Sequence, residues 1–189
     1  STRWTKWSCA SIRKKKRMSR NADEHGESLQ AKTVVERVSD RELLVKRRFD
    51  APARILFRAW SQAELFRQWW VPKSFGINLL SCTMDFRTGG AYRLEFEQPA
   101  PAPPMAFFGT YLDVVPNARI VWTNEESEDG PVTTVSFEDR GDQTIVTVRN
   151  QFPSKEALDR ELESGGTGAL SETLAQLEAF VLHPGARNG

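Results

Sequence analysis

The sequence predicts an α+β fold, in which a curved antiparallel β-sheet of six to seven strands wraps on a long C-terminal helix, with two short helices after the first strand. Three observations support this prediction. Leu170, Leu174, Leu177 and Val181 follow one another at steps of four, three and four, which gives one apolar stripe along a helix. Several segments between residues 41 and 152 alternate apolar and polar residues, as half-buried strands do. Turn-forming residues separate these segments and favour antiparallel hairpins.

Length and composition indicate one domain without a metal or cofactor site. The chain has 189 residues, of which 39% are hydrophobic, and this is enough for one sizeable core. No apolar run approaches the roughly 20 residues that a membrane-spanning helix needs. The two cysteines, Cys9 and Cys82, lie far apart, and the two histidines, His25 and His183, lie outside the predicted core. We therefore expect a cytoplasmic protein with no metal, no cofactor and no histidine-based catalysis.

Charge divides the chain into a basic N-terminal segment and an acidic body. Residues 1–20 hold eight of the 26 basic residues and no acid, which leaves 18 basic and 25 acidic residues, a net charge of −7, in residues 21–189. So acidic a body is a poor match to the phosphate backbone of nucleic acids. We expect residues 1–38 to be a disordered extension, residues 39–183 the folded domain and residues 184–189 a disordered tail. The composition of the extension also suits a targeting segment or an electrostatic arm, and Met18 would make an ordinary start.

The first predicted strand and the helices after it come from residues 41–72. Leu43, Val45 and Phe49 fall on alternate positions, and Arg47 interrupts this pattern. Asp50-Ala-Pro52 then gives a helix start, with Asp50 as the candidate N-cap, and a second short helix ends in Trp69-Trp-Val-Pro72. Two tryptophans at a helix exit are costly to leave in water, so this segment is expected to cap a core or a pocket.

The sheet is completed by a run of predicted strands separated by turns. Tyr92, Leu94 and Phe96 point to one face, whereas apolar residues occur on both faces of the preceding segment, so that its facing stays open. The proline-rich stretch Gln98–Pro104 is expected to be a stiff hairpin loop, with a proline-rich peptide ligand as the alternative, and the acidic stretch Glu125–Asp129 is expected to be a solvated hairpin. The strands are predicted over Ile77–Met84, Tyr92–Glu97, Phe107–Val115, Arg119–Asn124, Val132–Glu138 and Gln143–Phe152.

The C-terminal helical region, Ser154–Leu182, is expected to cover the sheet. Glu172, Gln176 and Glu178 form the polar face opposite the apolar stripe, as on a surface helix. Three glycines, Gly165, Gly166 and Gly168, interrupt the region. They predict either a break between two helices or a gap between the helix and its partner surface, where a ligand or loop fits.

Several of these segments resemble one known family over roughly residues 41–182. The sequence is similar to the SRPBCC (START-like) superfamily, and more narrowly to its domain related to the activator of the heat-shock protein 90 ATPase. This resemblance implies a helix-grip fold with a hydrophobic cavity beneath the terminal helix. Two positions depart from the family pattern: Thr88 stands where a proline is usual before two glycines, and Leu170 stands where the terminal helix usually has a tryptophan. The matching motifs are Asp50-Ala-Pro52, Phe57-Arg-Ala-Trp60, Trp69-Trp-Val-Pro72, Asp85-Phe-Arg-Thr-Gly-Gly90, Gly109-Thr-Tyr111 and the spaced Thr173-Leu174…Leu177.

The leading hypothesis for function is a module that binds a hydrophobic or amphipathic small molecule between the sheet and the C-terminal helix. Asp85 and Arg87 could supply polar contacts at its mouth, and the tyrosines could supply oriented hydroxyls. For each aromatic residue taken alone, ordinary core packing is the alternative. The residues expected to bind the ligand are Trp69, Trp70, Tyr92, Phe108, Tyr111, Trp122, Phe137, Leu170 and Leu174.

Two other classes of function follow from the resemblance. Relatives in the superfamily include polyketide cyclases and aromatase-like enzymes, but acid–base catalysis here would have to use Tyr92, Tyr111, Asp85 or Glu95, so the sequence leans away from an enzyme. The family name also suggests a stress-response protein that contacts a chaperone. A further domain found in that relative has no room here, which lowers the expectation of a chaperone partner. The sequence is compatible with a homodimer as well as with a monomer.

Overall fold

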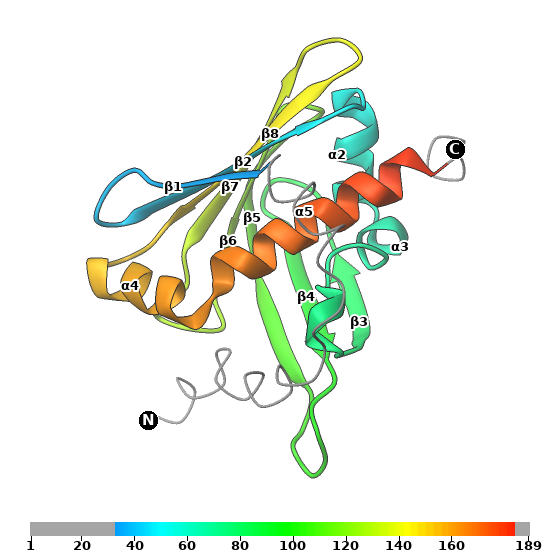
Figure 1. The fold of residues 1–189 in the computed structure, drawn as a ribbon. Coiled ribbons are helices and arrows are strands. Elements are labelled where there is room, and N and C mark those ends of the chain that lie inside the picture. The colour runs from blue at the N-terminus through cyan, green and yellow to red at the C-terminus, as the bar shows by residue number, and fades with distance from the viewer. Residues whose placement is uncertain (1–32, 184–189) are drawn as a thin grey trace, which may run out of the picture.

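The computed structural model describes residues 33–183, which form one antiparallel sheet of eight strands with a long helix lying across it (Figure 1). The strand order is β1-β2-β8-β7-β6-β5-β4-β3, so the sheet has β1 and β3 at its edges. The α+β helix-grip architecture predicted from the sequence is confirmed.

The strands are β1 Thr33–Arg37, β2 Glu42–Phe49, β3 Leu79–Met84, β4 Ala91–Phe96, β5 Met105–Val115, β6 Arg119–Thr123, β7 Val132–Asp139 and β8 Thr144–Gln151. The helices are α2 Ala53–Ser61, α3 Ala63–Phe66, the 3-10 turn η2 Lys73–Phe75, α4 Lys155–Ser164 and α5 Gly166–Leu182.

The N-terminal end of the domain differs from the prediction, because one more strand precedes the expected first one. β1 pairs with β2 along its whole length, from Thr33 opposite Arg47 to Arg37 opposite Leu43. The domain therefore starts before residue 39, and eight strands replace the predicted six to seven. Residues 1–32 of the predicted extension and the predicted tail, residues 184–189, lie outside the described residues.

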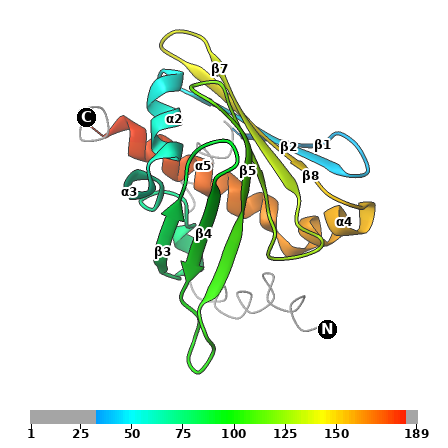
Figure 2. The same cartoon turned by 180° about the vertical axis from the view of Figure 1, so that it is seen from behind.

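The C-terminal helical region is broken into two helices, as one of the two interpretations of its glycines predicts. α4 ends at Gly165, whose positive φ of 85° is a left-handed conformation that glycine adopts without steric cost. α5 then runs across the face of the sheet, with α4 near its N-terminal end and α2 and α3 near its C-terminal half (Figures 1 and 2). A Cβ added at Gly168 would have no atom within 4 Å, so this glycine does not mark a tight contact.

The main core lies between the sheet and α5. Leu174, Leu177 and Val181 of the predicted apolar stripe are buried in it, together with Ile55, Leu56, Ala59 and Trp60 of α2. A second, smaller core lies under α4, where Leu158 and Leu162 pack with Leu43 and Phe152. The helical region therefore covers two separate apolar clusters.

A buried ion pair joins the sheet to α5 through the main core. Arg47 of β2 is 1% exposed and Glu178 of α5 is 6% exposed, and an Arg47 Nη2 to Glu178 Oε2 distance of 2.6 Å links them. Arg47 also donates a hydrogen bond to the Thr33 hydroxyl of β1. Glu178 was expected on the solvent face of the helix, and this expectation is wrong because its partner faces inward from the strand.

No helix within residues 33–183 is both long enough and apolar enough to span a bilayer.

Candidate ligand-binding site

Aromatic rings between α2, the segment after α3 and the sheet form one connected cluster, centred on Trp60. The centroid of the Trp60 ring lies 4.8 Å from that of Trp69, 5.6 Å from that of Trp70 and 5.8 Å from that of Trp122. These separations are typical of favourable aromatic pairs. The structure thus brings together three of the tryptophans that the sequence assigned to a ligand site.

A second group of rings continues the cluster toward β4 and β5. Phe57 of α2 contacts Phe137 of β7 at 5.7 Å and Phe86 at 5.8 Å between ring centroids. Phe86 contacts Tyr111 at 4.9 Å, and Tyr111 contacts Tyr92 at 5.6 Å. The predicted residues Tyr92, Tyr111 and Phe137 therefore share one inner face with the tryptophans.

Exposure separates the predicted site residues into enclosed and accessible ones. Trp69 is 1% exposed and Leu174 is fully buried, so both are core residues. Trp70 and Leu170, in contrast, pack against the core but stay half-buried. We use the name apolar rim for seven half-buried apolar residues that pack against the main core, which are Trp70, Val71, Ile77, Leu79, Met105, Phe107 and Leu170.

Gln176 of α5 fixes the backbone of the Trp69–Lys73 segment. Its side-chain amide donates to the carbonyl oxygens of Trp69 at 2.7 Å and Val71 at 2.8 Å, and its side-chain oxygen accepts from the backbone N–H of Lys73 at 2.8 Å. The predicted polar face of α5 is therefore turned partly toward this segment, rather than wholly toward solvent.

Two neighbours of Gln176 extend this attachment along α5. The Thr173 hydroxyl donates to the Trp70 carbonyl at 3.1 Å, and the Glu172 carboxylate accepts from the backbone N–H and the hydroxyl of Ser74. Side chains of α5 thus hold the backbone of Trp70 at the apolar rim.

Phe108 is the predicted site residue that does not join the inner cluster. It pairs across the sheet with Arg93 and lies under the Arg93 guanidinium, whose carbon is 5.7 Å from the ring centroid. Arg93 is exposed, so both side chains lie on the outer face of the sheet. Phe107, its neighbour in sequence, packs against the core and contacts Phe96 at 5.3 Å. Phe107 therefore takes the inward position that the sequence analysis gave to Phe108.

The two predicted polar residues, Asp85 and Arg87, pair with each other in the turn between β3 and β4. Arg87 Nη2 lies 2.8 Å from Asp85 Oδ2, and both side chains are more than half exposed. The turn is fixed by its own backbone, because a Cβ on Gly90 would lie 1.9 Å from the Asp85 carbonyl oxygen. Thr88, where the family pattern has proline, accepts a hydrogen bond from the Val114 N–H of β5. This geometry supports a structural turn.

Comparison with known proteins places this geometry in a family. The model of the family described as Activator of Hsp90 ATPase homolog 1-like protein matches residues 50–181. The chain belongs to this family. Its domain is therefore an SRPBCC domain, of a family whose fold is generally suited to ligand binding. No curated protein of known function matches the chain.

Solved structures share the fold of this Activator of Hsp90 ATPase homolog 1-like domain at low sequence identity. A protein from Nitrosomonas europaea is 21% identical, with 76% of this chain and 96% of that chain covered and a TM-score of 0.69. A protein from Rhodobacter sphaeroides is 17% identical, with 79% and 97% covered and a TM-score of 0.71. An AHSA1-like protein from Aeromonas hydrophila is 16% identical, with 78% and 96% covered and a TM-score of 0.62.

The acid–base candidates of this Hsp90-activator-like domain do not form a catalytic pair. The Tyr92 hydroxyl donates to the Thr123 carbonyl at 2.8 Å, and burial raises the pKa of both Tyr92 and Tyr111 well above the ordinary value. Glu95 accepts hydrogen bonds from Arg93 and Ser81, which lower its pKa. Residues 33–183 contain no group of three His, Cys, Asp or Glu side chains that could hold a metal ion.

Glu126 is a titratable residue that the sequence analysis did not single out. Glu126, in the loop between β6 and β7, is half-buried, and its Oε2 atom is buried with no hydrogen-bond partner in residues 33–183. Burial raises the pKa of the Glu126 carboxyl, and the backbone N–H groups of Glu126 and Phe108 only partly oppose this effect. The expectation that this loop is only a solvated hairpin is wrong at Glu126.

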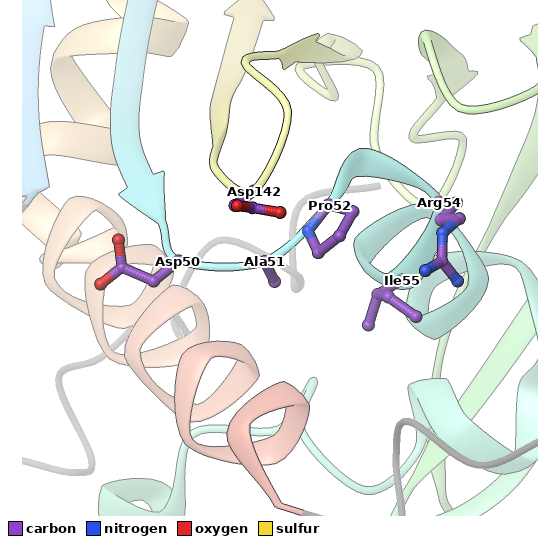
Figure 3. A pocket seen from close by; sticks show the side chains of 6 residues that line it. All are labelled: Asp50, Ala51, Pro52, Arg54, Ile55 and Asp142. Carbon is purple, nitrogen blue, oxygen red and sulfur yellow. The ribbon is translucent and has the colours of Figure 1, made fainter.

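A separate surface pocket lies where the start of α2 meets the loop between β7 and β8 (Figure 3). Its volume is about 310 Å³, and Asp50, Pro52, Arg54, Ile55 and Asp142 line it with Ala51. Asp50, expected to cap α2, instead accepts a hydrogen bond from the Gln143 side chain at 2.8 Å. None of the predicted ligand-binding residues lines this pocket, and we assign it no function.

Proposed function

We propose that this domain binds a hydrophobic or amphipathic small molecule at the apolar rim, between the sheet and the N-terminal half of α5. The main observation in support is that the residues of the apolar rim, which are half-buried, pack against a core that contains the buried aromatic cluster. An apolar ligand seated at this margin would remove the exposed part of the rim from water, at roughly 25 cal/mol per Å² of apolar surface.

The fixed backbone of Trp70 supports the proposal. Binding sites gain affinity when their side chains are held in place before the ligand arrives, because less conformational freedom is lost. Thr173 and Gln176 hold the backbone on either side of the Trp70 side chain to α5. The indole also stacks on Phe66, with a centroid separation of 4.7 Å, and so offers a preformed apolar surface.

The substitution Leu170→Trp tests this location. The larger side chain is expected to fill part of the site, so that the affinity for the neutral fluorescent probe N-phenylnaphthylamine falls by about tenfold or more. The free energy of unfolding is expected to change by about 1 kcal/mol or less, because Leu170 is only half-buried. Fluorescence titration measures the uptake, and urea unfolding measures the stability.

Leu182→Trp on the same helix is the matched control, because Leu182 is 48% exposed and lies outside the rim. This variant is expected to take up the probe like the unchanged protein. Equal uptake by the Leu170→Trp variant and the control would contradict the location of the site.

A second candidate function comes from the family match. The family is named after an activator of the Hsp90 ATPase, so contact with a chaperone is the alternative. A pull-down with purified Hsp90 separates the two candidates, since a binding module for small molecules predicts no retention of the chaperone.

A further inference from the structure

The loop between β6 and β7 contains a polar network in which nearly every group has a partner. The Asn124 amide donates to the Pro131 carbonyl at 2.7 Å and to the Thr133 hydroxyl at 3.0 Å. Thr133 in turn donates to the Asn150 side-chain oxygen at 2.8 Å. The Glu125 carboxylate accepts from the Thr123 hydroxyl at 2.6 Å. The network leaves Glu126 Oε2 as the buried oxygen without a partner in residues 33–183.

Glu126 belongs to a loop whose first residues contact the inner aromatic cluster. The Tyr92 ring is buried on the inner face of β4 and contacts Tyr111, and its hydroxyl lies 2.8 Å from the Thr123 carbonyl oxygen and 3.4 Å from Asn124 Oδ1. The Tyr92 hydroxyl hydrogen is already used in the bond to the Thr123 carbonyl, so it is not available to a ligand. Glu126 Oε2, in the loop at this end of the cluster, therefore still has hydrogen-bonding capacity.

The surroundings favour a neutral carboxyl group at Glu126. No described Lys, Arg or His forms an ion pair with Glu126, and the negative charge of Glu125 also raises the pKa of its carboxyl. The backbone N–H groups of Glu126 and Phe108 favour the charged form, but the effect of burial is larger. A buried charge without an opposite charge costs several kcal/mol, whereas a neutral carboxyl can donate a hydrogen bond. A ligand oxygen would supply the missing acceptor without placing an ion in the apolar interior.

We propose that Glu126 is the specificity-determining residue of the ligand site and donates a hydrogen bond to a neutral oxygen atom, a carbonyl or hydroxyl, at the polar end of an otherwise apolar ligand. This inference rests on the proposed function, because it places the apolar part of the ligand against the aromatic cluster and the rim. It identifies the ligand class as neutral oxygen-bearing apolar molecules, as opposed to organic cations or pure hydrocarbons.

Three naphthalene probes test the inference on the full chain, with quenching of tryptophan fluorescence as the measure of affinity. Acetylnaphthalene, a neutral ketone, is expected to bind about five- to tenfold more tightly than naphthalene, the range that one buried hydrogen bond gives. Naphthylmethylammonium is expected to bind no better than naphthalene. Naphthalene binding alone tests the proposed function, and the ratio of acetylnaphthalene to naphthalene affinity tests Glu126, so the two failures are distinguishable.

Substitutions assign the preference to one side chain. Glu126→Met is expected to abolish the preference for acetylnaphthalene over naphthalene, and Glu126→Gln, whose amide can still donate, is expected to keep part of that preference. Glu125→Gln, which removes a neighbouring, exposed carboxylate, is the matched control and is expected to keep the full preference for acetylnaphthalene.

The preference is also expected to depend on pH. Since the carboxyl donates only while it is protonated, the preference is present at low pH and is lost as the pH rises through the raised pKa of Glu126. In Glu126→Gln the remaining preference is independent of pH. A preference that survives in Glu126→Met, or a preference of the unchanged protein for the ammonium probe or for naphthalene, would overturn the inference.

Discussion

Replacing Glu178 with leucine is expected to lower the free energy of unfolding by about 3–5 kcal/mol, the cost of leaving one partner of a buried ion pair behind. Arg47 would then keep a charged guanidinium in the core, 1% exposed, without the carboxylate that lies 2.6 Å from it. The same substitution would also loosen the attachment of α5 to β2. Urea unfolding monitored by tryptophan fluorescence measures the change.

The double substitution Arg47→Met with Glu178→Leu is the control for this prediction. Because both charges are removed together, the double variant is expected to regain most of the stability that Glu178→Leu loses. A double variant as unstable as Glu178→Leu alone would show that packing around these positions, not the ion pair, dominates. A loss below about 1 kcal/mol in Glu178→Leu would place the pair among weak surface ion pairs and contradict the account.

The substitution Trp69→Ala is expected to cost about 3–5 kcal/mol, as truncation of a large core side chain does. Trp69 is almost fully buried, contacts Trp60 at 4.8 Å between ring centroids, and donates its indole N–H to the Ala59 carbonyl at 3.1 Å. Truncation would leave a cavity and deprive that buried carbonyl of this donor. Chemical denaturation followed by circular dichroism measures the loss.

Trp70→Ala separates the core residue from the rim residue next to it. Trp70 is half-buried, so its truncation is expected to cost about 1–2 kcal/mol in stability but to weaken probe uptake at the rim. Equal losses of stability in Trp69→Ala and Trp70→Ala would contradict the division of the two tryptophans between core and site.

The strands and helices, and the faces that they turn inward, could be predicted largely because local sequence patterns determine them. The alternation of Tyr92, Leu94 and Phe96 fixes the inner face of β4, and all three residues are buried. The stripe of Leu174, Leu177 and Val181 likewise fixes the covered face of α5. The facing of residues 79–84 could not be predicted, because a register shift between Leu79 and Ser81 breaks the alternation of β3.

The paired polar groups could not be predicted from local patterns, because their partners are distant in sequence. Arg47 and Glu178 are 131 residues apart, and each one alone resembles an interruption or a solvent-facing charge. A signal was present at Arg47, since it falls in phase with the inward residues Val45 and Phe49. Gln176 and Glu172 were similarly assigned to solvent, although they bind the backbone of residues 69–74.

The outward position of Phe108 and the burial of Glu126 both differ from the expectation, and they have different causes. Residues two apart in a strand lie on the same face of the sheet, so Phe107, Gly109 and Tyr111 share one face and Phe108 lies on the other. This period could have been used to place Phe108. The burial of Glu126 depends on how a loop folds back against β4 and β5, which no periodic pattern records. An acidic loop sequence usually indicates a solvated turn, and here only one of its carboxyl groups departs from that pattern.

Native mass spectrometry of the full chain, purified without harsh washing, tests the binding of a small molecule most directly. We predict a reproducible excess over the mass of the chain that disappears on denaturation, and a smaller or absent excess in the Leu170→Trp variant. The excess would also give the mass of the captured molecule and so a chemical class to compare with neutral, oxygen-bearing apolar compounds. An unliganded mass that persists when acetylnaphthalene or N-phenylnaphthylamine is added in excess would contradict the proposed function and shift the weight to a chaperone partner.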